Sequence, residues 1–423
     1  MIATAPTSTA EPAAELQSLP KYERKPALPA LTGIRTLLAL FILLFHFTPA
    51  GLGPLYAIID NGYVFVSFFF LISGYILAYN YLDRPERLRL SDFWVARISR
   101  LYPVYLFALV LFWEMLRTEH QVRNATDFWE GAILSPLLMQ GWFPNLATFW
   151  NTVAWTLSCE IALYAMFPLL MRVRWPQTPG RLIALILGFW AVGMIPHMTY
   201  IVLNPDHLST LSDHTLGTAW AHNIGLQDAH LHLVQTDRYS GGFWVQWLKY
   251  TPLPYLCTFL AGIVLGKLQS VLTLTSRQRL VIALAGFAWA WCTFYLLIKH
   301  LPYIMIHGGL LTPIFATIII GLSGPNPVVT FFSWRPLVEV GSATYCLYLL
   351  HFNTFELIHN HHLPERLHFT RFDPWVSYIA VIALALAARR FIEHPCQKAI
   401  GNWWKRYKAR SASTAISAPK LSS

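Results

Sequence analysis

The sequence predicts an all-α, polytopic membrane protein with about ten transmembrane helices and with both termini in the cytoplasm. Of its 423 residues, 55% are hydrophobic and only 12% are charged, and the mean hydropathy is +0.44. Soluble globular chains contain about 25% charged residues. Apolar segments long enough to cross a bilayer recur along the chain, and the basic residues cluster between alternate segments.

Ten apolar segments are expected to span the membrane: 31–50, 61–81, 101–116, 150–171, 182–203, 246–266, 280–298, 304–322, 339–359 and 374–394. With the N-terminus in the cytoplasm, 23 of the 31 Lys and Arg residues belong to the cytoplasmic side and 7 to the opposite side, while Arg35 lies inside the first span. This asymmetry follows the positive-inside rule. The net charge of +10 is therefore a signal of topology and does not indicate a nucleic-acid partner.

The expected domain organisation is simple. Residues 1–30 are rich in Ala, Pro, Ser and Thr, and they predict a disordered cytoplasmic tail. Residues 31–396 form the transmembrane domain, and residues 397–423 form a basic cytoplasmic C-terminal tail. The five cysteines show no paired spacing, so neither a disulfide framework nor a metal site is expected.

Two segments fit this scheme less simply. Residues 127–141 are apolar but short and contain Pro136, so they are expected to lie in the interface or to re-enter the membrane. The longest loop, 204–249, is placed outside and holds five histidines at spacings that match no standard metal motif. An ordinary surface loop is the favoured interpretation, and a metal-sensing loop is the alternative.

The first span carries two ionisable side chains, Arg35 and His46, eleven residues apart. At 100° per residue they lie only about 20° from each other around the helix, and the rise separates them by roughly 16 Å along its axis. Ionisable groups inside a bilayer are costly and usually functional. The pair therefore predicts a site with Arg35 at the water interface and His46 near the midplane.

Arg97 and Arg100 form a second basic feature, on one helix face just before the third span. Ordinary positive-inside anchoring would explain them. Alternatively, two planar guanidinium groups at the cytoplasmic mouth would bind phosphate.

The fourth span places Glu160 near the middle of an apolar helix, with Tyr164 one turn later and Trp155 more than one turn earlier. A buried carboxylate needs a partner or a wet cavity. We expect Glu160 to accept from, orient or charge-balance an imidazole, and a purely structural hydrogen bond between helices is the alternative.

The ninth span carries Tyr348 and His351, which are neighbours on one helix face. A functional and a structural histidine are equally compatible with this pattern. In the second span, Ser73 and Gly74 permit close helix packing. Glu393, at the end of the tenth span, is expected to help to cap that helix near the lipid headgroups.

Taken in order, these motifs resemble the membrane acyltransferase-3 family. The matching segments are LTGIR with the following histidine, FFFLISGY, RISRLYP, WTLSCE, TYCLYLLH and E-x-P, and they extend over nearly the whole chain, from Leu31 to Pro395. The family includes bacterial O-acetyltransferases of surface polysaccharides and acyltransferases of small secreted metabolites. The chain departs from the family pattern at Ser67, where many members have Asp, and at Thr344, where Ser is usual.

The resemblance implies an acyltransferase of the inner or plasma membrane, with no bound cofactor and with acyl-CoA, most simply acetyl-CoA, as co-substrate. Arg35 and His46 match the family's R-x10-H pair, and Arg97 and Arg100 match its RxxR motif. The three arginines would then receive the phosphates of CoA. The imidazole of His46 would serve as general base or as transient acyl carrier.

The remaining site residues follow from the same resemblance. Trp155 and Glu160 match the family's W-x4-E motif, and Glu160 would support the His46 imidazole as the acid of a triad does. Trp155, Tyr164, Tyr348 and His351 would line the tunnel toward the acceptor, which is a hydroxyl of a surface or lipid-linked glycan or of a small metabolite.

A secondary transporter with a midplane His/Glu proton relay is the alternative from another class. The sequence shows no internal repeat and no paired Gly/Pro-broken spans, which such transporters commonly have. No G-x-G-x-x-G, Walker or G-x-S-x-G motif is present.

Overall fold

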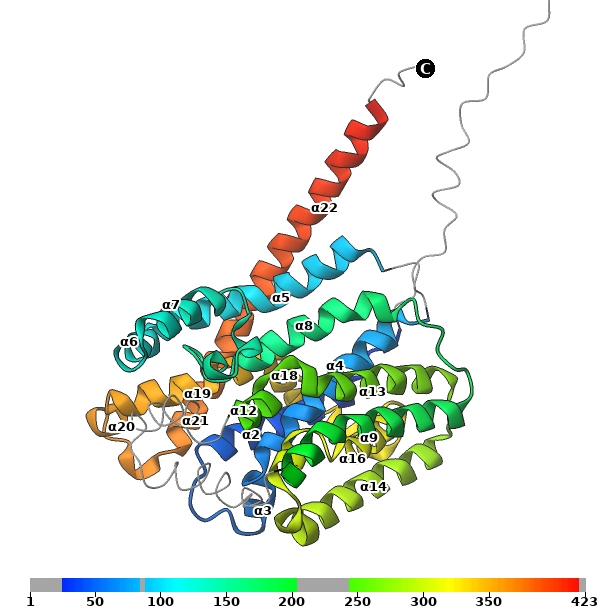
Figure 1. Cartoon of the computed structure of the whole chain (residues 1–423), viewed down its shortest axis with the longest axis horizontal. Coiled ribbons are helices and arrows are strands. Elements are labelled where there is room, and N and C mark those ends of the chain that lie inside the picture. Colours follow the sequence, from blue (N-terminus) through cyan, green and yellow to red (C-terminus); the bar gives the residue numbers. More distant parts are fainter. Residues whose placement is uncertain (1–24, 84–87, 204–242, 418–423) are drawn as a thin grey trace, which may run out of the picture.

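The computed structural model describes residues 25–83, 88–203 and 243–417, and within these ranges the chain is helical and contains no β-strand (Figure 1). The long helices, in chain order, are α2 (Pro29–His46), α4 (Phe65–Tyr81), α5 (Leu90–Leu111), α6 (Trp113–Val122), α7 (Ala125–Leu134), α8 (Trp155–Leu170), α9 (Pro179–Leu203), α12 (Phe243–Tyr250), α13 (Pro252–Val271), α14 (Ser276–Cys292), α16 (Thr312–Leu322), α18 (Arg335–Ser342), α19 (Thr344–Asn360), α21 (Trp375–Ala388) and α22 (His394–Ser417). Most of the predicted N-terminal tail, and residues 204–242 of the His-rich loop, lie outside the described residues.

Shorter helical pieces connect these elements. They are η1 (Gly53–Leu55), α3 (Tyr56–Ile59), η2 (Gly62–Val64), η4 (Gln140–Trp142), η5 (Pro144–Leu146), η8 (Ile298–His300), α15 (Tyr303–His307), α17 (Pro327–Phe332), α20 (Leu363–Arg366) and η9 (Thr370–Phe372). Two further pieces, η7 (Thr293–Leu297) and η10 (Arg389–Glu393), are π-helical turns.

Each of the ten predicted spans coincides with a helix or a pair of consecutive helices. Among the described residues, eight helical stretches are long and apolar enough to cross a bilayer. The other two predicted spans contain α8, with 16 residues, and α19, with 17 residues. The prediction of an all-α, polytopic membrane protein is confirmed.

Two helices begin at clearly different residues from the predicted spans: polar residues before the third span were assigned to a loop, and residues before α8 were assigned to the fourth span. Helix α5 begins at Leu90, eleven residues before the predicted start, so that the turn containing Arg97 and Arg100 is helical. Helix α8 begins at Trp155 instead of residue 150. The residues just before α8 are held by side-chain hydrogen bonds, since Asn151 donates to the carbonyl of Leu349 over 3.1 Å.

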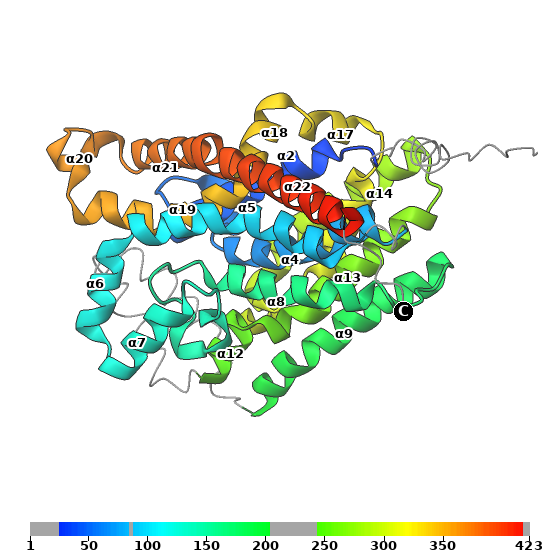
Figure 2. The ribbon, with the colours of Figure 1, turned by 90° about the horizontal axis from the view of Figure 1, so that it is seen from above.

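Residues 127–141 do not cross the bundle. They form the end of α7, which has only 10 residues, and a chain that turns back against α5 and α8. Tyr105 donates to the carbonyl of Ser135 over 2.6 Å, and Ser158 donates to the carbonyl of Leu138 over 2.6 Å. Helices α6 and α7 thus form a corner at the end of the molecule where α20 also lies (Figure 2).

The last helix, α22, leaves the body of the molecule (Figure 1). It packs on α5, where Asp92 accepts hydrogen bonds from Trp404 over 2.6 Å and from Lys408 over 2.7 Å. The basic segment predicted from residue 397 onward is therefore helical as far as Ser417.

Helices α4 and α13 pack together closely because glycines lie at their crossing. A methyl group added at Gly262 would lie 2.0 Å from the carbonyl oxygen of Leu71, and one at Gly74 would lie 2.2 Å from that of Phe259. Small residues at such positions allow helix backbones to approach within a membrane. This contact fixes α4, one wall of the pocket described below.

We expect Gly262→Ala to destabilise the folded protein, since its methyl group would meet backbone that cannot move aside. Overpacking of this kind costs about 1–3 kcal/mol. Thermal unfolding in detergent should show a lowered Tm. The matched control is Gly188→Ala in the middle of α9, where a methyl group meets nothing within 4 Å. Equal Tm values for the two variants would contradict the tight crossing.

Candidate active site

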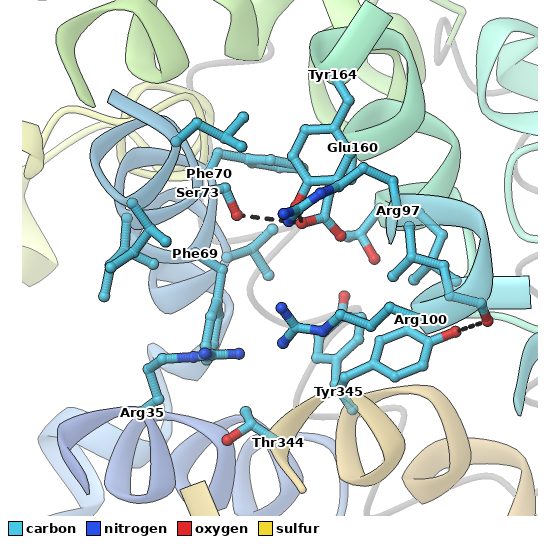
Figure 3. Close-up of a pocket in the computed structure, with 18 residues that line it drawn as sticks. Arg35, Phe69, Phe70, Ser73, Arg97, Arg100, Glu160, Tyr164, Thr344 and Tyr345 are labelled. Atoms are coloured by element: carbon cyan, nitrogen blue, oxygen red, sulfur yellow. Dashed lines mark hydrogen bonds between the residues drawn. The ribbon is translucent and has the colours of Figure 1, made fainter. Parts of the chain in front are cut away.

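A pocket opens between α2, α4, α5, α8 and α19, five helices that are far apart in the sequence (Figure 3). Its polar lining comes from three arginines, one carboxylate, hydroxyl groups and tyrosines: Arg35, Ser73, Arg97, Arg100, Thr156, Glu160, Tyr164, Thr344, Tyr345 and Tyr348. The rest of its lining is apolar, including Phe69 and Phe70. The structure therefore places Arg35, Arg97 and Arg100, which the sequence grouped together, in one lining with Glu160, Tyr164 and Tyr348.

The three arginines converge on this pocket. The guanidinium groups of Arg35 and Arg100 face each other across it, and Arg97 reaches toward Glu160 (Figure 3). The Arg35 guanidinium lies 5.7 Å from the centre of the Phe69 ring, which holds it by a cation–π contact. The Nε atoms of Arg35 and Arg97 are buried and have no hydrogen-bond partner among the described residues. Buried donors of this kind indicate a bound ligand or water.

Glu160 provides negative charge at the arginine end of the pocket. Its carboxylate accepts a hydrogen bond from Ser73 over 3.2 Å and another from the Tyr164 hydroxyl. The Tyr164 ring also lies 5.6 Å from the guanidinium carbon of Arg97. The sequence assigned Ser73 to helix packing, and its hydrogen bond to a buried acid is an additional role.

Glu393 is a further site residue, which the sequence placed as a helix cap near the headgroups. The structure buries it, with 7% of its surface exposed, and sets it 3.9 Å from Nε of Arg100. Cys346 donates to the same carboxylate over 3.2 Å. Glu393 ends the π-helical turn η10, and such turns commonly mark functional sites. Neither apolar periodicity nor motif spacing gives a signal for a π-helical turn.

Glu160 in the lining and Glu393 beside Arg100 therefore offset part of the charge of the three arginines, and the formal charge of this group of side chains stays positive. Paired arginines with free N–H groups match the geometry of phosphate oxygens. The arrangement is suited to an anionic ligand with an apolar arm, because the remaining lining is mostly apolar.

The two histidines predicted from different spans lie side by side. His46 is the last residue of α2, and its ring centre is 5.2 Å from that of His351 on α19. Nδ1 of His351 is 2.7 Å from the carbonyl oxygen of Tyr348. A carbonyl only accepts, so Nδ1 carries the proton and Nε2 of the neutral ring is left with its lone pair. This Nε2 atom is buried and has no partner among the described residues.

Tyr348 joins the histidine pair to the pocket. It lines the pocket itself, and its ring centre lies 5.7 Å from that of His351. Neither histidine belongs to the pocket lining. The histidine pair thus lies behind the Tyr348 wall, at the end of α2 opposite the arginines.

The structure gives Glu160 hydrogen-bond partners other than the imidazole of His46. Glu160 is bonded to Ser73 and Tyr164 among the arginines, whereas His46 lies against His351. Glu160 lines the pocket together with Arg35, whereas His46 does not line it and lies roughly 16 Å from Arg35 along α2. The spacing of residues within one helix does not predict how deep in the membrane a residue on another helix lies.

Trp155 is also placed differently from the prediction. It does not line the pocket, although it precedes Thr156, which does. Its side chain, 5% exposed, packs in an aromatic cluster with Tyr250 at 5.0 Å, Tyr255 at 5.8 Å and His307 at 6.2 Å between ring centres. Its role is to pack α8 against α12, α13 and α15.

No group of three His, Cys, Asp or Glu side chains that would hold a metal ion occurs in the part of the chain that the structure describes. The chemistry available in the described site is that of imidazole, guanidinium, carboxylate and hydroxyl groups.

Comparison with known proteins places this arrangement in a family. A family model described as an acyltransferase domain matches residues 28–388, which include every helix that lines the pocket. The chain belongs to the acyltransferase-3 family. The resemblance found in the motifs is thereby confirmed.

Several curated relatives of this acyltransferase-3 protein are named for acyl transfer. The acyltransferase MdmB of Streptomyces mycarofaciens is 32% identical over 156 residues, which cover 34% of the chain and 40% of MdmB. The peptidoglycan O-acetyltransferase OatA of Listeria monocytogenes is 22% identical over 92% of the chain and 59% of OatA. The O-acetyltransferase OatA of Staphylococcus aureus is 23% identical over 88% of the chain and 57% of its own length.

The chain thus spans about 40 to 60% of the length of these relatives. No solved structure matches it.

Proposed function

We propose that the protein is an O-acyltransferase of the inner or plasma membrane that moves an acyl group, most simply acetyl, from cytoplasmic acyl-CoA to an acceptor hydroxyl. The acceptor belongs to a surface or lipid-linked glycan or to a small secreted metabolite. The observation that carries the proposal is the convergence of three guanidinium groups, two of them with unpartnered Nε atoms, on a pocket whose far wall adjoins a histidine pair.

The donor is inferred from the positive charge of the arginines and from the distance between Arg35 and His46. In the N-in orientation that the basic residues favour, Arg35, Arg97 and Arg100 lie at the cytoplasmic end and would bind the diphosphate of CoA. The apolar lining would hold the pantetheine arm. Arg35 and His46 are separated by roughly 16 Å along α2, a distance that an extended arm of this kind covers.

The histidine pair offers two routes for the transfer. In the carrier route, a ring nitrogen of His46 attacks the thioester carbonyl, the C–S bond breaks and CoA leaves as a thiolate. The acceptor oxygen then attacks the acyl-imidazole, the C–N bond to His46 breaks, and Nε2 of His351 takes the hydroxyl proton, which finally neutralises the CoA thiolate. In the direct route, a histidine takes that proton as the oxygen attacks the thioester, and the departing thiolate receives it.

His351 is suited to the proton-accepting role in either route. Its Nδ1 is occupied by the Tyr348 carbonyl, so that Nε2 is the available base. Glu160 and Glu393 would set the charge and orientation of the arginines, since their carboxylates lie at that end of the site.

Purified protein in detergent should bind acetyl-CoA and should release free thiol from it when acceptor fragments are added. The thiol released can be followed with a chromogenic disulfide, and binding can be measured by calorimetry. Candidate acceptors are peptidoglycan and polysaccharide fragments. Absence of acetyl-CoA binding by folded protein would contradict the proposed donor, and CoA binding without acyl transfer to any hydroxyl would contradict the proposed reaction.

A further inference from the structure

A second cavity adjoins the pocket at the cytoplasmic end. It lies between residues 25–28, the first turns of α2 and the end of α4, where Tyr79 and Asn80 line it. It shares Arg35, Ile72 and Ile76 with the pocket, so the two spaces are consecutive and Arg35 stands at their boundary. We call this second cavity the vestibule.

Positive charge gathers at the vestibule. Lys25, which lines it, lies 2.6 Å from Oδ2 of Asp83, and Lys267 of α13 lies 3.3 Å from Oδ1 of the same carboxylate, with Asp83 and Lys267 both standing just outside the lining. Two ammonium groups therefore share one carboxylate, and Arg35 adds a third cation. Partial burial raises the pKa of Asp83, but the hydrogen bond from Lys25 and the charges of both lysines outweigh it and hold the pKa below its ordinary value.

The position of Lys25 is fixed by contacts with α4. The Tyr79 hydroxyl donates to the carbonyl of Pro26 over 3.0 Å, and the Lys25 ammonium lies 4.9 Å from the centre of the Tyr79 ring. The side chains of Lys25 and Lys267 are 21% and 13% exposed. Both cations are thus partly shielded from water, where attraction to an anion is stronger than at an open surface.

We propose that the vestibule binds the 3′-phosphorylated adenosine end of acyl-CoA, with Lys25 and Lys267 contacting the 3′-phosphate. This inference rests on the proposed function. If the arginines hold the diphosphate and the arm points to the histidines, the nucleoside end must lie on the outer side of Arg35, which is the vestibule. A phosphate carries more charge than a carboxylate and has three acceptor oxygens, so it engages both lysines beside Asp83.

The test compares acetyl-CoA with acetyl-dephospho-CoA, which lacks only the 3′-phosphate. The unmodified protein should bind acetyl-CoA about ten-fold more tightly, because partly exposed charged hydrogen bonds are lost with the dephospho ligand. In Lys25→Ala and Lys267→Ala the preference should fall, and in the double variant the two ligands should bind equally. Affinity for acetyl-dephospho-CoA should stay at the unmodified value, which also reports that the variants are folded.

The matched control is Lys299→Ala, since Lys299 is exposed at the far end of the helical stretch Ser276–His300, and this variant should keep the full preference. Equal binding of the two ligands by the unmodified protein would overturn the vestibule assignment and leave the acyl-CoA donor intact. An equal loss of affinity for both ligands in the lysine variants would overturn it as well, because the lysines would then affect the shape of the vestibule and not the recognition of the 3′-phosphate. Binding of neither ligand by the folded, unmodified protein would instead overturn the proposed donor.

Discussion

Replacing His46 with glutamine should abolish acyl transfer while the protein remains folded and inserted in the membrane. Glutamine keeps a hydrogen-bonding side chain of similar reach at the end of α2. It has no nitrogen that can carry an acyl group or accept a proton at neutral pH. Loss of such a group lowers rates by about 10²- to 10⁴-fold. The rate of acetyl transfer, with expression and Tm as readouts of folding, gives the measurement.

His300→Gln is the control for the His46 variant, since His300 is an exposed histidine at the same end of the bundle. It should transfer at the unmodified rate. A well-folded His46→Gln variant with near-normal activity would show that His46 only packs against His351. An acyl group trapped on the protein, and lost in His46→Gln, would select the carrier route over the direct one.

Alanine at Arg97 or Arg100 should weaken acetyl-CoA binding by about ten- to a hundred-fold. Each variant removes a charged contact to a phosphate, which is worth about 1.5–3 kcal/mol. Lysine at either position should restore only part of the affinity, because an ammonium cannot form the bidentate fork. Calorimetric affinity for acetyl-CoA, together with the KM for transfer, checks the prediction.

Arg172→Ala distinguishes ligand binding from membrane anchoring. Arg172 is exposed just after the end of α8 and contributes to the charge bias that predicts the N-in orientation, but it does not line the pocket. The Arg172→Ala variant should bind acetyl-CoA with the affinity of the unmodified protein. If the Arg97 and Arg100 variants also bind normally, these arginines act only as topology anchors.

The positions of the helices and the site residues on them followed from the sequence to different degrees. Apolar length alone located a helix at every predicted span, because a bilayer demands uninterrupted apolar segments. The shared face of Arg35 and His46 followed from helix geometry, which is fixed within one helix. The contact of His46 with His351, and the separation of Glu160 from both, depend on the relative depth of α2, α8 and α19. Spacing along a chain contains no information on that depth.

Glu393 shows a second limit of prediction from the sequence. As the last acid of an apolar segment it resembled a helix cap at the membrane surface, and the π-helical turn η10 instead places it against Arg100 and Cys346. One extra residue in a helical turn rotates everything that follows, and the arrangement depends on α5 packing beside it. The vestibule was unpredictable for the same reason, since Lys25 and Lys267 belong to opposite halves of the sequence and meet only at Asp83.

Arg35 and His46 occupy a single uninterrupted helix with no internal proline. The spacing between Arg35 and His46 is therefore set by backbone hydrogen bonds and is fixed. Under the proposed mechanism, a donor is admitted by the length of the linker between its phosphates and its thioester. The acyl group lies beyond that linker, past the end of α2, where the helix imposes no such limit. The proposed mechanism therefore separates selectivity for the phosphate-bearing part of the donor from selectivity for its acyl group, because the two depend on different parts of the site.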